Sequence, residues 1–242
     1  MPSDRAPLRA LAVYCGSSQG TDPVFAHAAT SLGHALAEDN RPLIYGGGSK
    51  GIMGVVSEAV LAKHGQVTGV VPAAMLAAGG EGDKTVAPEE YKVFVRLSEP
   101  GREGVEVIVV QSMHERKVEM AKRACGFVGL PGGFGTFEEI FEAITWTQLG
   151  IHNKPVLLLN VKKFYEPIRA LIEGAINSGF IRKESKALAV FVDGPEDLAK
   201  HGTFDWGTAA LQALDQWGGA PAGIFAGRWG DDKSKDNALE LS

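Results

Sequence analysis

Residues 42–64 read PLIYGGGSKGIMGVVSEAVLAKH, and they contain the structural unit from which we predict the fold. The apolar run 42–45 is a short strand, the glycines at 46–48 form a turn, and 53–64 has the pattern of a helix. Another apolar strand, 66–71, follows directly. A strand, a crossover helix and a second strand are typical of a parallel β-sheet.

The same alternation continues along the chain. Further strands are predicted at 8–15, 105–110, 127–130, 155–160 and 187–192. Further helices are predicted from Asp22-Pro23 to about 39, at 113–124, 137–149 and 165–177, and from a capped start at Pro195. Nearly continuous apolar strands are buried on both faces. With right-handed crossovers, the pattern predicts an α/β fold, a Rossmann-like doubly wound parallel sheet with helices on both faces.

The length of 242 residues allows one large α/β domain, which we place at 1–226. Residues 73–102 mix glycine, proline and charge without one period, so we expect an irregular insertion containing a short helix and a short strand. Residues 227–242 read GRWGDDKSKDNALELS, and we expect them to form a polar, mobile tail.

Composition excludes several classes of protein. The net charge is −5 and no Lys/Arg block occurs, which argues against nucleic-acid binding. Cys15 and Cys125 are too few for a disulfide framework or a metal set. No stretch approaches the roughly 20 apolar residues of a membrane helix, and the first apolar run is too short for a signal peptide. We therefore expect a cytoplasmic protein without membrane partner or metal.

Glycine-rich turns follow three predicted strands, at 16–18 (GSS), 46–51 (GGGSKG) and 131–136 (PGGFGT). Ligands of doubly wound sheets bind beyond the carboxyl ends of the strands, and bare backbone N–H groups suit a phosphate. One such turn can be needed only for its geometry, but three at one edge indicate a ligand site. GGGSKG also fits G-x-G-x-x-G, but the next strand ends at 69–72 without an acidic residue, which disfavours an NAD-dependent dehydrogenase.

Charged residues beside these turns allow two interpretations each. Arg116 and Lys117 fall on or beside the apolar face of the helix 113–124, so they either lie at the rim of the core or face the pocket as a cationic cluster. Thr136 and Glu139 have the spacing of a capping box. Alternatively, the carboxylate of Glu139 stabilises positive charge on a bound sugar or activates water there. Glu139→Gln separates these possibilities, because glutamine also completes a capping box.

The motif PGGFGTFEE at 131–139 fits P-G-G-x-G-T-x-x-E of the Lonely Guy (LOG) family, whose members are often mislabelled lysine decarboxylases. Matches at 15–18 (CGSS), 45–54 (YGGGSKGIMG), 112–117 (SMHERK) and 142–156 support a resemblance over roughly 10–195. It implies a cytokinin-activating phosphoribohydrolase that needs no cofactor. The substrate would be an N6-modified adenosine 5′-monophosphate, or AMP, and the products free base and ribose 5-phosphate.

The resemblance also implies site residues and an assembly. Arg116 and Glu139 are the implied catalytic pair. The implied substrate-binding residues are Ser17, Ser18, Gly46, Gly47, Gly48, Glu99, Met113, Lys117, Gly132, Gly133, Gly135, Thr136, Glu138 and Thr145. Glu99 lies in a segment longer than in compact members, where glutamates 81, 89 and 90 are alternatives. Family members form homodimers or assemblies of dimers, to which the helices 113–124 and 137–149 would contribute.

An alternative from another class is a non-hydrolytic carrier of a nucleotide or of the molybdenum cofactor. Related Rossmann-like proteins with similar glycine loops bind that cofactor without turning over nucleotides. The pairing of Arg116 with Glu139 favours the enzyme, because a carrier has no need of a carboxylate beside a glycosidic bond.

Overall fold

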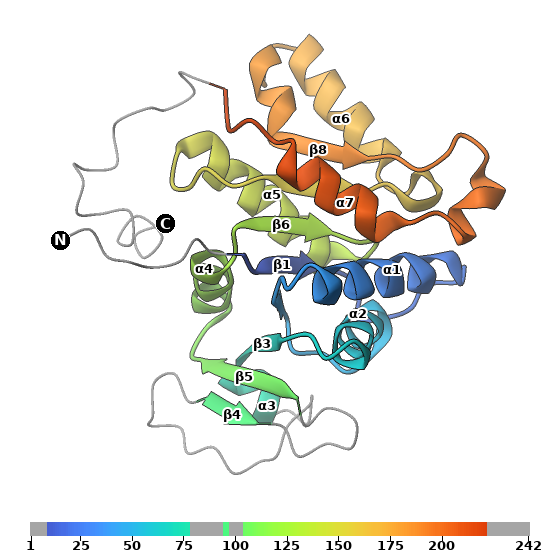
Figure 1. Ribbon diagram of the computed structural model, residues 1–242. Helices are drawn as coiled ribbons and strands as arrows, with labels where there is room; N and C mark the ends of the chain where they lie inside the picture. The colour runs from blue at the N-terminus through green and yellow to red at the C-terminus, as the bar shows by residue number, and fades with distance from the viewer. Residues whose placement is uncertain (1–8, 78–93, 97–103, 222–242) are drawn as a thin grey trace.

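The protein is described from a computed structural model in residues 9–77, 94–96 and 104–221. These residues form one sheet of eight strands in the order β4-β5-β3-β2-β1-β6-β7-β8 (Figure 1). The strands are β1 Leu11–Tyr14, β2 Leu43–Tyr45, β3 Val67–Pro72, β4 Phe94–Arg96, β5 Val105–Val110, β6 Gly126–Gly129, β7 Val156–Leu159 and β8 Ala189–Val192. All neighbouring pairs are parallel except β4 with β5, so the predicted doubly wound parallel sheet is confirmed, with one antiparallel edge strand added.

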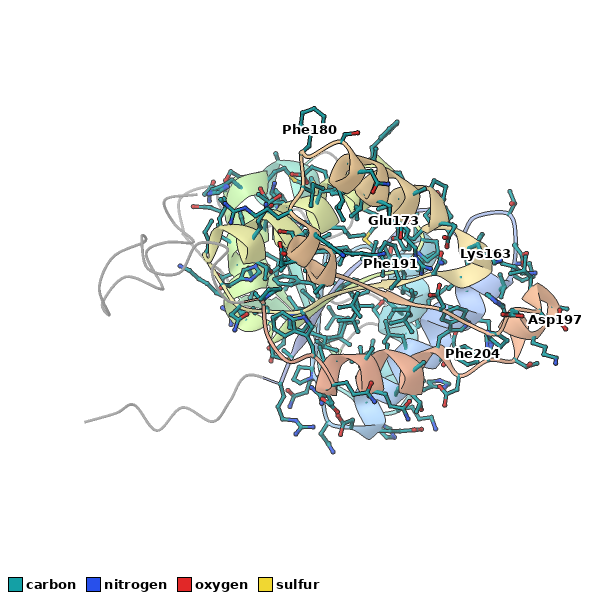
Figure 2. All side chains as sticks on the ribbon, turned by 90° about the horizontal axis from the view of Figure 1, so that it is seen from above. Lys163, Glu173, Phe180, Phe191, Asp197 and Phe204 are labelled. Carbon is teal, nitrogen blue, oxygen red and sulfur yellow. The ribbon has the colours of Figure 1, made fainter. Side chains whose placement is uncertain are left out.

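Helices cover both faces of this sheet. They are α1 Val24–Glu38, α2 Gly51–Ala62, α3 Ala73–Ala77, α4 Met113–Arg123, α5 Phe134–Leu149, α6 Glu166–Asn177 and α7 Trp206–Asp215, with 3₁₀ turns at Val161–Lys163, Lys183–Leu188 and Leu198–Gly202. One apolar cluster joins α1, α2 and α7 to one face, and a second joins α4, α5 and α6 to the other. Figure 2, which views the molecule from above, shows α6 and α7 on opposite sides of the sheet.

The strands supply side chains to both clusters in alternation. In β1, Leu11 and Val13 belong to the first cluster, whereas Ala12 and Tyr14 belong to the second. Every residue of β1 is buried, which explains why the strand is apolar throughout instead of alternating between apolar and polar. The order of strands reverses at β1, because β2 lies on one side of it and β6 on the other. This reversal defines the switch point at which such sheets bind ligands.

The insertion at 73–102 contains α3 and β4, the short helix and short strand expected there. Residues 78–93 and 97–103 lie outside the described residues, so Glu99 and its alternatives are not placed. The expected tail at 227–242 lies outside them as well. Within the described part of the chain, no helix is long and apolar enough to span a membrane.

The prediction of a helix that begins at Pro195 was wrong. A 3₁₀ turn occupies Leu198–Gly202, and the α-helix begins only at Trp206, where the Asp205 carboxylate accepts the N–H of Thr208. The indole of Trp206 is fully buried and donates to the carbonyl oxygen of His201 at 3.1 Å. The segment before the helix therefore wraps around this side chain instead of continuing as a helix.

The helices α1 and α2 pack so closely that Gly33 has no room for a side chain. A Cβ at Gly33 would lie 2.6 Å from the Cβ of Ala59 and 2.8 Å from the carbonyl oxygen of Val56. Gly174 in α6 is also a helical glycine, but no described neighbour lies within 4 Å of its Cβ position. Helix propensity alone favours alanine at both positions by about 0.5–1 kcal/mol.

We predict that Gly33→Ala lowers the free energy of unfolding by about 1–2 kcal/mol, because overpacking at the α1–α2 contact outweighs the gain in propensity. Gly174→Ala should raise it by about 0.5–1 kcal/mol. Urea unfolding of both variants measures this difference. Equal stabilisation by the two substitutions would show that the close helix contact is not a constraint.

Candidate active site

The three glycine-rich turns pack directly on one another at the switch point. The N–H of Gly16 donates to the carbonyl oxygen of Pro131 at 3.1 Å, which joins the turn after β1 to the turn after β6. The carbonyl oxygen of Gly16 accepts the N–H groups of Ile52 and Met53 at 3.0 and 3.3 Å, which joins it to the start of α2. The turn after β1 is thus the centre of the site, and the other two turns flank it.

Glycine is required where these backbones meet. Gly51 has φ +64°, and a Cβ there would lie 2.2 Å from the carbonyl carbon of Ser17. A Cβ at Gly132 would lie 2.2 Å from the Oγ1 of Thr136 and 2.8 Å from the nitrogen of Gly16. Any side chain at either position would separate the turns, so these two glycines hold the three loops together.

The first turn of α5 presents free backbone donors. Its N-cap, Gly133, makes no side-chain cap, and the first helical hydrogen bond runs from the N–H of Phe137 to the carbonyl oxygen of Gly133. The N–H groups of residues 134–136 therefore have no acceptor within the described ranges. At α2, by contrast, the carbonyl oxygen of Gly16 already accepts two of the first-turn donors, the N–H groups of Ile52 and Met53. The start of α5 is consequently the better site for an anionic group.

Of the two interpretations of Thr136 and Glu139, the structure contradicts the capping box. The helix begins at Phe134, not at 137, and its N-cap is Gly133. Thr136 is buried inside the first turn, where it cannot serve as the N-cap. The helix starts earlier because the glycine-rich backbone enters it without needing a capping side chain. The carboxylate of Glu139 is therefore available for another interaction.

Glu139 forms an ion pair with Arg116 of α4. The distance from Arg116 Nη2 to Glu139 Oε1 is 3.1 Å, and the two side chains are only 11% and 8% exposed. The Nε of Arg116 is buried without a hydrogen-bond partner among the described residues. Gly46 makes space for this guanidinium, since a Cβ there would lie 2.3 Å from Arg116 Nη2. Of the two interpretations of Arg116, the structure thus supports the one in which it faces the pocket.

Burial controls the protonation of this carboxyl group. Desolvation raises the pKa of Glu139 to about 7, although the positive charge of Arg116 opposes the increase. Near neutral pH the group can therefore gain or lose a proton readily, as an acid–base catalyst requires. Burial also raises the pKa of the neighbouring Cys15 thiol, which remains protonated and is a poor nucleophile.

A cavity of about 520 Å³ lies over the three turns. This volume is within the usual range for small-molecule sites. The predicted site residues that line it are Ser17, Gly46, Gly47, Gly48, Arg116, Gly133, Gly135, Thr136 and Glu139. The lining thus contains both predicted catalytic residues and at least one residue from each glycine-rich turn.

Six other predicted residues are described by the structure but are not among those that line the cavity. They are Ser18, Met113, Lys117, Gly132, Glu138 and Thr145. Lys117 is buried between α4 and α5, where its ammonium pairs with Glu138 and, at 2.9 Å, with Glu142. Burial by itself lowers the pKa of Lys117. Hydrogen bonds to the two carboxylates together raise the pKa by more than burial lowers it, so the net shift is upward. These ion pairs connect α4, which carries Arg116, to α5, which carries Glu139.

Two of these neighbours have local partners. The Thr145 hydroxyl donates to the carbonyl oxygen of Phe141 at 2.7 Å, within α5. The sulfur of Met113 lies 3.9 Å from Arg116 Nη1, so it contacts the guanidinium from the side. Direct contact of either residue with a substrate stays a prediction.

Seven described lining residues were not named individually among the predicted site residues, although Gly16, Lys50 and Phe134 belong to the glycine-rich turns predicted to bind a ligand. They are Cys15, Gly16, Lys50, Met53, Val71, Met75 and Phe134. Lys50 and Phe134 occupy variable positions inside two of the quoted motifs, so the motifs were the only signal for them. Met75 belongs to α3 in the irregular insertion, and nothing in its local pattern indicated a path to the site. In the described part of the chain, no group of three or more His, Cys, Asp or Glu could hold a metal ion.

Comparison with known proteins identifies the family. The family model described as "Possible lysine decarboxylase" matches residues 53–201. The chain is 42% identical over 190 residues to cytokinin riboside 5′-monophosphate phosphoribohydrolase LOG2 of Arabidopsis thaliana, covering 78% of this chain and 80% of that protein. The chain belongs to the LOG family. The enzyme LOG of Oryza sativa subsp. japonica is 43% identical over 194 residues, or 80% of this chain and 72% of that protein.

Solved structures share the fold of this LOG-family chain. The molybdenum cofactor carrier protein of Chlamydomonas reinhardtii superposes with a TM-score of 0.54, over 87% of this chain and all of that one. The two sequences are only 20% identical. This similarity supports the doubly wound architecture alone and carries no conclusion about the ligand.

We predict that Gly46→Ala raises the pKa of Glu139 further above 7, because the new Cβ displaces the guanidinium that opposes the increase. Gly48→Ala is the matched control, since its Cβ would meet only the flexible end of Met53, at 2.6 Å. Titration of ¹³C-labelled glutamate carboxyls by NMR, assigned with Glu139→Gln, measures both variants. An unchanged midpoint in Gly46→Ala would show that Gly46 does not position Arg116.

Proposed function

We propose that this protein hydrolyses the N-glycosidic bond of adenosine 5′-monophosphates, including the N6-modified monophosphates of cytokinin ribosides. The products are the free base and ribose 5-phosphate. The observation that carries this proposal is the buried pairing of Glu139 with Arg116 in a cavity that also contains an open helix N-terminus. The activity named for the LOG relatives supports it.

The 5′-phosphate binds at the first turn of α5. The free N–H groups of residues 134–136 and the positive end of the helix dipole both favour an anion there. Gly133 and Gly135 line the cavity, and no described atom lies within 4 Å of either Cβ position. The backbone can therefore approach the phosphate oxygens closely, and binding energy from this remote group positions the ribose.

Glu139 acts on the ribose. When the bond between C1′ and the base breaks, its electron pair leaves with the base and positive charge develops on the sugar. A fixed, buried carboxylate stabilises that charge more in the transition state than in the substrate. Water adds its oxygen to C1′, and Glu139 accepts the proton that the water releases. The departing base takes up one proton, supplied by Glu139 directly or through solvent, so the step gives neutral free base and leaves the carboxylate ionised again. The pKa of about 7 suits this general-base step.

Arg116 keeps Glu139 functional in two ways. Its positive charge opposes the effect of burial and maintains a useful fraction of ionised carboxylate at neutral pH. It also holds the carboxylate at one position through the 3.1 Å contact. The buried Nε without a described partner remains available to a ribose or phosphate oxygen.

The carrier alternative is less well supported. The carrier protein of Chlamydomonas reinhardtii shares the fold but only 20% of its sequence with this chain. Such a similarity says nothing about ligand chemistry. A carrier also has no need of a buried, ion-paired carboxylate beside a glycosidic bond. The homodimer or assembly of dimers, the cytoplasmic location and the absence of nucleic-acid partners stay predictions.

We predict that Glu139→Gln reduces the release of base from isopentenyladenosine 5′-monophosphate by about 10²–10⁴-fold, because the amide neither accepts the proton nor carries the charge. The matched control is Glu173→Gln on α6 (Figure 2). The carboxylate of Glu173 pairs with Lys186, and neither residue is among the described residues that line the cavity. Chromatography of the free base measures both rates. Retention of most activity in Glu139→Gln would exclude Glu139 as the catalytic carboxylate.

A further inference from the structure

Lys50 is a cation that lines the cavity, and none of the described residues pairs with it. It is the N-cap residue of α2, it is exposed, and its side chain makes no cap. Within the described ranges its ammonium forms no hydrogen bond or ion pair. The other two cations of the site differ, since Arg116 pairs with Glu139 and the neighbouring Lys117 pairs with two carboxylates.

The charge of the cavity depends on this lysine. Among the lining residues that the structure describes, the charged side chains are Lys50, Arg116 and Glu139. The last two form an ion pair, so their charges largely cancel. Lys50 therefore supplies the net positive charge that an anionic ligand would experience in the cavity.

The packing of the loops places Lys50 across from the start of α5. Gly51, the next residue, packs against the backbone of Ser17. On its other side, the turn after β1 packs against the turn after β6, through the hydrogen bond from Gly16 to Pro131. Lys50 and the first turn of α5 thus flank the same central loop, and the long flexible stem of lysine can extend over it.

The backbone at the start of α2 does not provide this interaction. The N–H groups of Ile52 and Met53 already donate to the carbonyl oxygen of Gly16. A ligand near α2 would therefore find fewer open amides than at α5, but it would meet the ammonium of Lys50. The two helix starts contribute differently, one through its backbone and the other through a side chain.

We propose that Lys50 binds the 5′-phosphate of the substrate from the side opposite to α5. This inference rests on the proposed function. The ammonium supplies a charge-assisted hydrogen bond to a phosphate oxygen, in addition to the neutral N–H donors of α5. Lys50 thereby increases the preference of the site for nucleotides over compounds without a phosphate.

The test compares Lys50→Met with the wild-type protein. We expect kcat/KM for isopentenyladenosine 5′-monophosphate to fall about 10–100-fold, as for loss of a hydrogen bond to a charged group. Lys50→Arg should restore most of the loss. Lys63→Met, at a surface lysine that pairs with Glu38, is the control and should behave as wild type.

Two readouts show whether the lost contact is with phosphate. Inorganic phosphate should raise the melting temperature of the wild-type protein, and Lys50→Met should show a much smaller increase. Inhibition by adenine, which has no phosphate, should be equal in both proteins. An unchanged response to phosphate, or an equal weakening of adenine inhibition, would overturn the proposal.

The phosphate measurement does not require turnover, so it separates the two proposals. If phosphate stabilises the protein in a manner dependent on Lys50 but no nucleotide releases base, the proposed hydrolysis fails and the phosphate contact stands. If base is released and Lys50→Met changes neither kcat/KM nor phosphate binding, hydrolysis stands and the role of Lys50 is refuted.

Discussion

The buried ion pair between Arg116 and Glu139 is the interaction on which the arrangement of the site depends. Such a pair contributes little net stability, because the loss of hydration offsets much of the attraction between its charges. Gly46 leaves room for the guanidinium, and Lys117 joins α4 to α5 through Glu138 and Glu142. The surrounding contacts therefore hold in place a pair whose main use is chemical.

Three kinds of charged or polar group have different roles in the cavity. The ion pair faces the position proposed for the ribose, the open amides of α5 face the phosphate, and Lys50 adds the positive charge that the ion pair does not supply. This division explains how a phosphate and a carboxylate can occupy one cavity despite their like charges. The glycine-rich turns make it possible, because side chains at their contact points would separate the loops.

Much of this arrangement could be predicted from the sequence, since apolar runs and glycine turns report local structure. The runs that became β1, β2 and β6 placed three turns at one edge, which is where the cavity lies. Helix starts were less predictable: α5 begins without a side-chain cap, and α7 is delayed by the buried Trp206. Met75 could not be assigned to the site, because its position depends on how the chain crosses from β3 into α3.

The central claim is that the cavity hydrolyses a nucleotide whose phosphate positions the ribose. The most direct measurement is to incubate the wild-type protein with isopentenyladenosine 5′-monophosphate and, separately, with isopentenyladenosine, and to quantify base and sugar chromatographically. The account predicts equal amounts of free base and ribose 5-phosphate from the monophosphate, with far slower release from the riboside. Binding of the monophosphate by folded protein without any release of base would contradict it.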